Sequence, residues 1–382
     1  MRTTSLLKVA PLAADRVKEF DGERPYLATG DVGNDADIRP TWVTYAERPS
    51  RADLTVRPGD VCFARMASTR KVFEFTADHR DVILSTGFAV LRPDKSKVHP
   101  GYVRHWLGTD QFQAAKDRLS SGATQKAITN EKLSLLTIPL PESADDQVRI
   151  TEILDKADAL RAKRRAAIAQ LDTLTQSIFL DMFGDPATNP KGWTQKCIGR
   201  IGTVTTGNTP SREDSRNYGD AIEWIKSDNL NTGSYYATHA SERLSEAGMA
   251  CARVAPAGAI LVTCIAGSPG SIGNAAMVDR PVAFNQQINA FVPEDGSPHF
   301  FFAQLTVGKR LVQQASTGGM KGLVSKGRFE KILLMQPPPD LQDRFSELAL
   351  RIEAMKSGLY RSLAQMEALF TALENRAFRG EL

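Results

Sequence analysis

The sequence predicts an α+β protein in which two mixed α/β domains are separated by two long helices that pair as an antiparallel coiled coil. Three observations lead to this fold class. The 382 residues are too many for one ordinary domain and suit two of about 150 residues with connecting elements. The chain matches itself when Gln147 is laid on Gln342, which indicates a pseudo-twofold internal repeat. Each matching segment carries a narrow apolar stripe at helical spacing.

The first long helix is predicted within residues 145–183. Prolines at 139 and 141 precede it, and Gly184 with Pro186 ends it. Its heptad a positions are Ile150, Ala157, Arg164, Leu171 and Ile178, and its d positions are Ile153, Leu160, Ala167, Leu174 and Asp181.

The second long helix is predicted within residues 338–382, after three consecutive prolines at 337–339. It repeats the first helix without a gap as far as Phe183 and Phe378. Its a positions are Phe345, Ile352, Leu359, Met366 and Leu373, and its d positions are Leu348, Met355, Ser362, Leu369 and Arg376.

The two stripes are most simply buried against each other. A single apolar stripe usually packs on a local core, but two matched narrow stripes suit a coiled coil. Chain length allows either direction, because a whole domain connects the helices. A pseudo-twofold arrangement makes them antiparallel, with Ile150 near Leu373 and Ile178 near Phe345. The residues expected to pair are Ile150, Ile153, Leu160, Leu171, Leu174, Ile178, Phe345, Leu348, Ile352, Leu359, Leu369 and Leu373.

The α/β domains are predicted over residues 1–144 and 184–337, and their segments correspond in the same order. Each has a Pro/Gly turn feeding an apolar strand, a second strand ended by proline, an aromatic-rich helix, and a Gly/Lys loop leading into a strand. The first domain places them at 56–63, 88–93, 102–107 and 121–128, and the second at 254–261, 288–293, 300–305 and 317–324.

Composition excludes a membrane protein. Hydrophobic residues make up 42% and charged residues 24% of the chain, as in soluble globular proteins, and no stretch approaches the ~20 apolar residues that cross a bilayer. The N-terminus lacks the apolar run of a signal peptide, so we expect a cytoplasmic protein. A net charge of +4 permits a polyanionic partner without requiring one.

Motifs for catalysis or metal binding are missing from the sequence. An amino-methyltransferase needs an Asn/Asp-Pro-Pro-aromatic tetrapeptide, and residues 336–339 (QPPP) have no aromatic residue. Residues 318–322 (GGMKG) do not form a phosphate-binding loop. The five histidines stand singly, and the four cysteines form no CxxC pair, so buried reduced thiols are the preferred interpretation.

Several segments are characteristic of one family when they occur together. They are residues 177–185 (SIFLDMFGD), 207–212 (GNTPSR), 222–226 (IEWIK) and 376–382 (RAFRGEL). With the repeat, they make essentially the whole chain resemble the specificity subunits of type I restriction-modification systems. The first domain departs from the pattern, because it lacks a GxTPS-like opening and starts with residues 25–30 (PYLATG).

The resemblance implies that the two α/β domains are target recognition domains, each reading one half of a split double-stranded DNA sequence. The paired helices would then hold the halves at a fixed separation. Catalysis would belong to partners, namely two modification subunits that methylate adenine and two restriction subunits that translocate and cut DNA. S-adenosylmethionine, ATP and Mg²⁺ would belong to those subunits, and this chain would bind no cofactor.

Polar loops supply the candidate DNA contacts. Glycines let backbone N–H groups approach phosphate, while Arg, Asn and Gln can read base edges with paired hydrogen bonds. The candidates in the first domain are Arg65, Ser68, Thr69, Arg70, Lys71, Thr86, Gln125 and Lys126. Those in the second are Ser211, Arg212, Lys226, Ser268, Ser271, Asn285, Gln286, Gln287 and Lys321.

Plainer interpretations stay open for these residues. Each loop could be an ordinary turn, and the basic residues 161–165 of the first helix are more simply a solvated face than a DNA contact. A coiled-coil scaffold carrying two protein-binding heads is the alternative for the whole chain, and the polar character of the loops argues against it.

Overall fold

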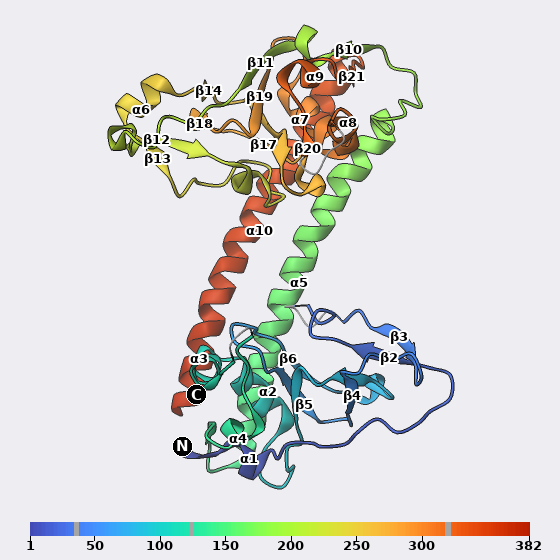
Figure 1. Cartoon of the computed structure of the whole chain (residues 1–382), viewed down its shortest axis with the longest axis vertical. Coiled ribbons are helices and arrows are strands. Elements are labelled where there is room, and N and C mark those ends of the chain that lie inside the picture. Colours follow the sequence, from blue (N-terminus) through green and yellow to red (C-terminus); the bar gives the residue numbers. More distant parts are fainter. Residues whose placement is uncertain (34–37, 123–124, 318–321) are drawn as a thin grey trace. The chain divides into compact units, whose positions relative to one another are not determined.

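The computed structural model describes residues 1–33, 38–122, 125–317 and 322–382. The chain forms two compact units, the first made of Met1–Ala166 and Arg361–Leu382 and the second of Ala167–Tyr360. The long helices α5 (Ala144–Phe183) and α10 (Pro339–Arg379) contribute to both. Each unit therefore contains one α/β domain, the beginning of one long helix and the end of the other (Figure 1).

The α/β domain of the first unit contains two sheets and a separate strand pair. One sheet has the order β3-β2-β7-β4, the other has the order β6-β5-β8, and β1 pairs with β9. The strands are β1 (Arg2–Ser5), β2 (Glu23–Leu27), β3 (Thr41–Thr44), β4 (Ala52–Thr55), β5 (Val61–Ala64), β6 (Val72–Glu74), β7 (Ile83–Ser85), β8 (Phe88–Leu91) and β9 (Thr137–Leu140). The helices are α1 (Leu6–Val9), η1 (Ala77–His79), α2 (Pro100–Gly108), α3 (Asp110–Leu119) and α4 (Asn130–Leu133).

The domain of the second unit has sheets of order β13-β12-β18-β14 and β11-β19-β15-β17, with strand pairs β10-β21 and β16-β20. The strands are β10 (Gln195–Cys197), β11 (Gly202–Thr206), β12 (Tyr218–Ile225), β13 (Arg243–Leu244), β14 (Val254–Ala255), β15 (Ile260–Thr263), β16 (Ile265–Ala266), β17 (Ala275–Met277), β18 (Val282–Phe284), β19 (Ile288–Pro293), β20 (Gly322–Leu323) and β21 (Leu333–Met335). The helices are η2 (Ile198–Arg200), η3 (Ser215–Asn217), η4 (Ser227–Leu230), α6 (Glu246–Cys251), η5 (Pro269–Ser271), α7 (Pro298–Val307), α8 (Lys309–Gln314) and α9 (Lys326–Glu330).

The two domains have the same topology, which confirms the predicted α+β repeat. The order β3-β2-β7-β4 corresponds to β13-β12-β18-β14, and in both sheets the middle pair is parallel, with Tyr26 opposite Ile83 and Trp224 opposite Ala283. The order β6-β5-β8 likewise corresponds to β17-β15-β19. The Pro/Gly turn, the strand ended by proline and the aromatic-rich helix all lie at equivalent places.

In each unit the central strands are buried on both faces because they lie between two layers. In β5, Val61 and Phe63 pack with α2 and the long helices, whereas Cys62 and Ala64 pack with the sheet that contains β2. In β15, Ile260 and Leu261 divide in the same way. Alternate side chains of a strand point to opposite faces, so a strand between two layers reads as a continuous apolar run.

The second domain extends one sheet by a strand, β11, that has no counterpart among the strands of the first domain. β11 pairs with β19 along residues 202–206, whereas in the first domain Leu12 makes only an isolated bridge to Leu91. Gly207 follows β11 and passes so close to the segment after β18 that a Cβ there would lie 2.2 Å from the Asn285 carbonyl oxygen. The GNTPS segment directly follows this strand, and the first domain, which has only the Leu12 bridge at this place, lacks the segment.

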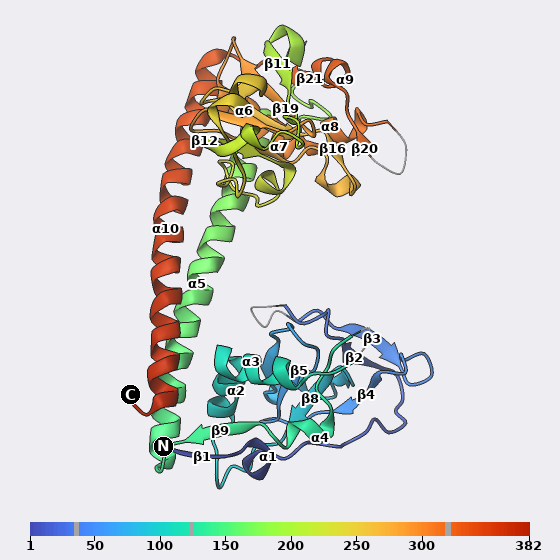
Figure 2. The same cartoon turned by 60° about the vertical axis from the view of Figure 1, so that its left-hand side comes forward.

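The long helices are antiparallel, as predicted. In the first unit Ile150 and Leu154, from the beginning of α5, share a core with Phe370 and Ala377, from the end of α10. In the second unit the end of α5 packs on the beginning of α10, and the ring centres of Phe179 and Phe345 are 5.3 Å apart. Figures 1 and 2 show the helices side by side from two directions.

The predicted set of pairing residues is wrong in part, because the buried face runs along positions a and e rather than a and d. Ile150, Phe345 and Ile352 are buried, and Ile153, Leu171, Ile178, Leu348, Leu359 and Leu373 are partly buried. Three of the d leucines are exposed, namely Leu160 at 55%, Leu174 at 45% and Leu369 at 59%. The residues buried at e positions are Leu154, Ile168, Ala349, Lys356, Phe370 and Ala377.

Polar residues at e positions explain why the heptad pattern favoured d. Adjacent helical positions are about 100° apart, so a shift by one residue rotates the buried face. Arg161 lies at e and stacks over the Phe370 ring at 4.1 Å, while Lys356 lies at e and pairs with Asp172 at 2.7 Å. The sequence has Leu160 and Met355 at d beside these cations at e, yet the cations have partners on the opposite helix.

None of the helices within the described residues is long and apolar enough to span a bilayer.

Candidate nucleic-acid interface

Three segments of the first domain gather into one surface, which we call the first loop site and define as residues 65–71, 86, 125 and 126. The Arg65 N–H donates to the Gly87 carbonyl at 2.9 Å, the Ala67 N–H to the Lys126 carbonyl at 2.9 Å, and the Ile128 N–H to the Arg65 carbonyl at 3.0 Å. These bonds bring together the eight residues of this domain that the sequence predicted as DNA contacts.

Two of those residues brace the first loop site from within. The Arg65 guanidinium donates to the carbonyl oxygens of Phe88 at 2.9 Å and Ile128 at 3.3 Å, and burial lowers its pKa. Lys71 Nζ donates to the Thr29 carbonyl at 2.5 Å. Both cations are occupied by backbone oxygens of their own domain.

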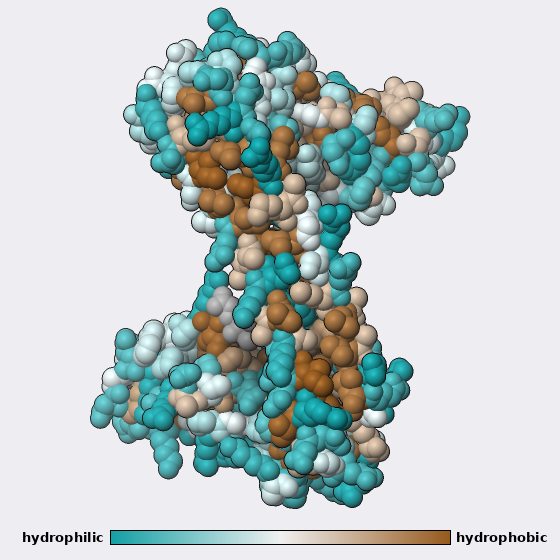
Figure 3. Space-filling view, turned by 180° about the vertical axis from the view of Figure 1, so that it is seen from behind, coloured by the Kyte–Doolittle hydropathy of each residue, from teal (hydrophilic) through white to brown (hydrophobic). Residues whose placement is uncertain are grey.

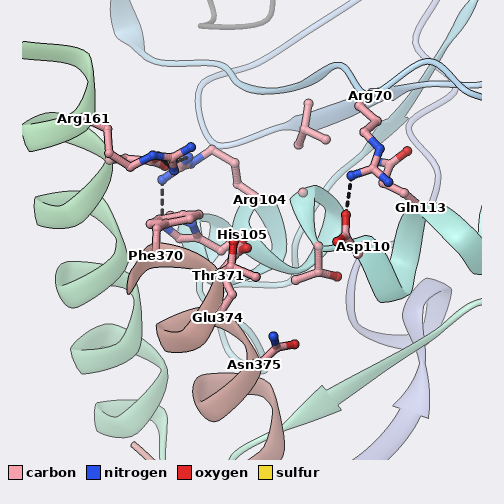
Figure 4. Close-up of a pocket in the computed structure, with 14 residues that line it drawn as sticks. Arg70, Arg104, His105, Asp110, Gln113, Arg161, Phe370, Thr371, Glu374 and Asn375 are labelled. Carbon is pink, nitrogen blue, oxygen red and sulfur yellow. Dashed lines mark hydrogen bonds and ion pairs between the residues drawn. The ribbon is translucent and has the colours of Figure 1, made fainter. Parts of the chain in front are cut away.

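The exposed part of the first loop site consists of Ser68, Arg70, Gln125 and Lys126, whereas Thr69 and Thr86 are partly buried. Ser68 adopts a φ of 60°, in the left-handed region. Arg70 forms an ion pair with Asp110 at the beginning of α3 (Figure 4). The side chains that a ligand can reach are therefore one paired cation, one lysine, one amide and one hydroxyl.

The second domain gathers its loops at the equivalent strand ends, and we define the second loop site as residues 208–212, 226–227, 267–274 and 285–287. The Asn208 N–H donates to the Phe284 carbonyl at 3.1 Å, and the Ser227 hydroxyl donates to Gln287 Oε1 at 3.2 Å. Thr209 donates to Gln286. The Cys264 and Ile265 N–H groups donate to the Gln287 carbonyl, joining the loop that follows β15.

The side-chain amides of residues 285–287 differ in exposure and in hydrogen bonding. Asn285 is buried, and its Nδ2 donates to Gln287 Oε1 at 3.0 Å. Gln287 is partly buried, and Gln286 is exposed. Because both Gln287 and Gln286 are held through their oxygens, each presents its amide N–H₂ as the group with remaining hydrogen-bonding capacity.

A carboxylate that the sequence analysis missed orients the cations of the second loop site. Arg212 donates to both oxygens of Glu242 at 2.8 and 3.0 Å, and Lys226 pairs with the same carboxylate. The hydrogen bonds from Arg212 lower the pKa of Glu242. Both cations lie over the Trp224 ring, at 5.4 Å for Arg212 and 4.9 Å for Lys226. No local pattern marks Glu242, because it is far from both cations in sequence.

Three of the four remaining predicted residues of the second domain lie in the second loop site, and the fourth lies outside the described residues. Ser211 is exposed, and its carbonyl accepts a hydrogen bond from Asn217 Nδ2 at 3.0 Å. Ser268 is exposed and Ser271 is partly buried, in a loop closed by the Ser271 N–H donating to the Ser268 carbonyl. Lys321 lies outside the described residues.

The thiols follow the sequence expectation only in part. Cys62 and Cys264 are buried, and burial raises the pKa of the Cys264 thiol to about 12. Cys197 is partly buried. Cys251 is exposed, contrary to the prediction, because it ends the short surface helix α6. Among the described residues no group of three or more His, Cys, Asp or Glu side chains is arranged to hold a metal ion.

Arginine, lysine, amide and hydroxyl groups on two loop surfaces can bind phosphates and base edges by hydrogen bonding. Residues 9–170 and 190–348 both match the type I restriction modification DNA specificity domain. The chain belongs to this family. Each of its two specificity domains covers one α/β domain and the adjoining part of a long helix. The function of the chain is therefore DNA recognition, and catalysis lies in partner subunits.

Individual relatives of this DNA specificity family are similar along nearly the whole chain. The type I restriction enzyme HindI specificity subunit of Haemophilus influenzae is 23% identical, over 83% of this chain and 85% of that one. A chain from a study of complex assembly in a type I restriction-modification system has a TM-score of 0.56 and 20% identity, over 100% and 98% of the two chains. The type I system S subunit from M. genitalium has a TM-score of 0.58 and 13% identity, over 99% and 96%. These two structures support the fold.

Proposed function

We propose that this chain reads a bipartite double-stranded DNA target, one half with each α/β domain, and directs adenine methylation and restriction by partner subunits. The observation that carries the proposal is that the two domains share one strand order and gather polar loops at equivalent strand ends. A repeat of one reading unit suits a target with two separate halves. The partners would be two modification and two restriction subunits, which would hold the S-adenosylmethionine, ATP and Mg²⁺.

The exposed side chains of each loop site fit base reading better than general attraction to phosphate. Bidentate arginine recognises guanine and paired amides recognise adenine in the major groove. The second loop site offers Arg212, which Glu242 holds over Trp224, and the N–H₂ group of Gln286. A net charge of only +4 over the whole chain is small for a protein that relies on phosphate neutralisation alone.

The long helices would set the number of unspecified bases between the half-sites. An α-helix is stiff and rises about 1.5 Å per residue, so its length fixes a distance. Each long helix follows one reading domain directly, and in each unit it packs on the other long helix through aromatic and aliphatic side chains. Such packing suits a spacer that does not bend.

The exposed d positions supply a surface for the modification subunits. In the first unit Leu160 and Leu369 are exposed on α5 and α10, and in the second unit Leu174 and Met355 are exposed on the same helices. Figure 3 shows hydrophobic side chains on the surface of each unit from one side. Apolar side chains grouped on a helix surface commonly mark a protein interface. The repeat presents such a surface twice, as two copies of one partner require.

Selection from a pool of random duplex DNA tests the proposal. The chain is purified alone and with its modification subunit, and the bound DNA is sequenced. We expect the complex to enrich a split motif and to methylate adenine in the presence of S-adenosylmethionine, and the chain alone to show no methyltransferase, nuclease or ATPase activity. Enrichment of no sequence, or methyl transfer by the chain alone, would refute the proposed function.

A further inference from the structure

Helix α3 holds the loop of residues 64–70 through a buried lysine. Lys116 has no exposed surface, and its Nζ donates to the carbonyl oxygens of Thr69 at 2.8 Å and Met66 at 3.1 Å, with the Ala64 carbonyl at 3.4 Å. An ammonium group has three donors, and Lys116 Nζ directs them at these carbonyl oxygens and at Asp117 Oδ1, which lies 3.5 Å away. The loop therefore wraps around a fixed positive charge.

The residue next to Lys116 holds the same loop at its most constrained point. Asp117 Oδ1 accepts a hydrogen bond from the Ser68 N–H at 3.0 Å. Ser68 has a φ of 60°, a conformation that residues with a Cβ seldom adopt without support. Arg70, two residues later, pairs with Asp110 from the first turn of α3 (Figure 4). One helix thus contacts the loop through three of its side chains.

Burying a lysine is expensive, so its presence requires an explanation. Desolvation lowers the pKa of Lys116, which means that burial works against its charge. An apolar residue of similar length would fill the space at lower cost, but it would remove the lysine donor from the Thr69 carbonyl and leave the Met66 carbonyl with only the 3.4 Å bond from the Thr69 N–H. The lysine is suited to fixing this backbone and, being buried, cannot touch DNA.

We propose that Lys116 and Asp117 are positioning residues for DNA reading, which hold residues 64–70 in the conformation that presents Ser68 and Arg70 to the first half-site. The inference rests on the proposed function of the first domain. It assigns sequence discrimination in part to two side chains that lie behind the reading surface. Loop side chains can then differ in identity while the helix keeps their backbone in place.

The second domain has a lysine at the equivalent helix. α8 follows α7 as α3 follows α2, and Lys309 Nζ donates to the Gly270 carbonyl at 2.6 Å and to Asn274. Gly273 has a φ of 82°, and a Cβ there would lie 3.0 Å from Lys309 Cγ. The loop after β15 is thus packed on a lysine of the following helix, as the loop after β5 is.

Variants of Asp117 and Ser68 test the proposal in the full chain bound to its modification subunit. The probes are the duplex that the wild-type complex selects from a random pool, and two versions of it with one half scrambled. For Asp117→Ala we expect at least a tenfold loss of discrimination at the first half and an unchanged second half. Asp117→Asn keeps an oxygen acceptor and should stay within threefold of wild type.

A rescue separates positioning from general stability. Glycine adopts a φ of 60° without steric cost, so in a Ser68→Gly background the Asp117→Ala change should cause no more than a twofold further loss. Lys116→Met extends the test and should behave like Asp117→Ala if it folds. Leu154→Ala is the matched control, because Leu154 is buried in the same unit on α5, and it should lower stability while keeping discrimination.

Three results would overturn the inference. Asp117→Ala could discriminate both halves as the wild type does, Leu154→Ala could lose the first half equally, or the loss in Asp117→Ala could persist undiminished in the Ser68→Gly background. A wild-type complex that selects no sequence would overturn the proposed function and this inference with it. The wild-type arm therefore distinguishes the two failures.

Discussion

Arg161 of α5 stacks over the ring of Phe370 of α10, with its guanidinium carbon 4.1 Å from the ring centre. Asp158 accepts a hydrogen bond from the same guanidinium at 2.8 Å. One repeat later the corresponding residues are Lys356 and Glu353, and there the lysine pairs with Asp172 of the opposite helix. In both units a cation on the buried face of one long helix meets a partner on the other.

The buried face at positions a and e predicts that Phe370 contributes more to the free energy of unfolding than its neighbour Leu369. Phe370 is buried, and Phe370→Ala should lower the free energy of unfolding by about 3 kcal/mol because it leaves a cavity beneath Arg161. Leu369→Ala is the matched control, and since Leu369 is exposed it should cost less than about 0.5 kcal/mol. Urea denaturation of both variants measures the difference. If Leu369→Ala lowered the free energy of unfolding as much as Phe370→Ala or more, the helices would pair through positions a and d instead.

Glu374 predicts a pH dependence of stability. It lines a cavity of about 350 Å³ in the first unit with Asp158, Arg161 and Phe370 (Figure 4). Burial, reinforced by the charge of Asp158, raises the pKa of Glu374 to about 7. The folded state then keeps this proton where the unfolded state has released it, so stability falls as pH rises from about 4.5 to 7.

Glu374→Gln should remove this loss, because the amide carries no charge to bury. We expect the variant to match wild type near pH 4 and to be more stable by about 1 to 3 kcal/mol at pH 8. Thermal unfolding at both pH values measures this. Glu367→Gln, on the same helix but exposed and paired with Arg165, is the control and should bring no gain. A Glu374→Gln variant that is no more stable at pH 8 than at pH 4, relative to wild type, would contradict the assignment.

Arg212 predicts a specific loss in the second half-site. Its guanidinium is fixed by two hydrogen bonds to Glu242, and Arg212→Ala should cost about 1 to 3 kcal/mol of discrimination at one base position of that half. Competition between duplexes that differ at single positions measures it. Arg216→Ala removes a more exposed charge, which pairs with Asp214 at the N-cap of η3, and it should leave discrimination intact. Equal losses in both variants would indicate a general charge effect instead.

The spacer proposal predicts the effect of lengthening a helix. Four residues inserted at Ala166 add about 6 Å, close to two base pairs at about 3.4 Å each, and turn the helix about 40° beyond one full turn. The recognised spacer should lengthen by one or two bases, with reduced affinity because of the rotation. Methylome sequencing of cells that carry the insertion reads the spacer directly. An active variant with the original spacer would refute the role of the helices.

The sequence predicted the repeat, both long helices and the matching turns and strands of the two domains because those features recur at fixed spacing or follow from apolar runs and proline. It placed the buried face of the helices one residue away, since Leu160 and Met355 at d are more apolar than Arg161 and Lys356 at e, and hydrophobicity alone favours them. The supports of the loop sites escaped detection for a different reason. Lys116 and Glu242 act through contacts with residues distant in sequence, and such contacts leave no local pattern.

If each domain reads its half-site independently, the methylomes of cells carrying single-site variants should show it. Wild type is compared with Lys126→Ala and Arg65→Ala in the first loop site, and with Gln287→Ala and Lys321→Ala in the second domain. We predict a split motif with methylated adenine in both halves, in which each variant relaxes only the half read by its own domain. A lost base contact should cost about 1 to 3 kcal/mol, whereas Arg65→Ala should act by removing an internal support of its loop. If a variant of one domain altered both halves, or if all four variants left the motif unchanged, independent reading by the two domains would be refuted.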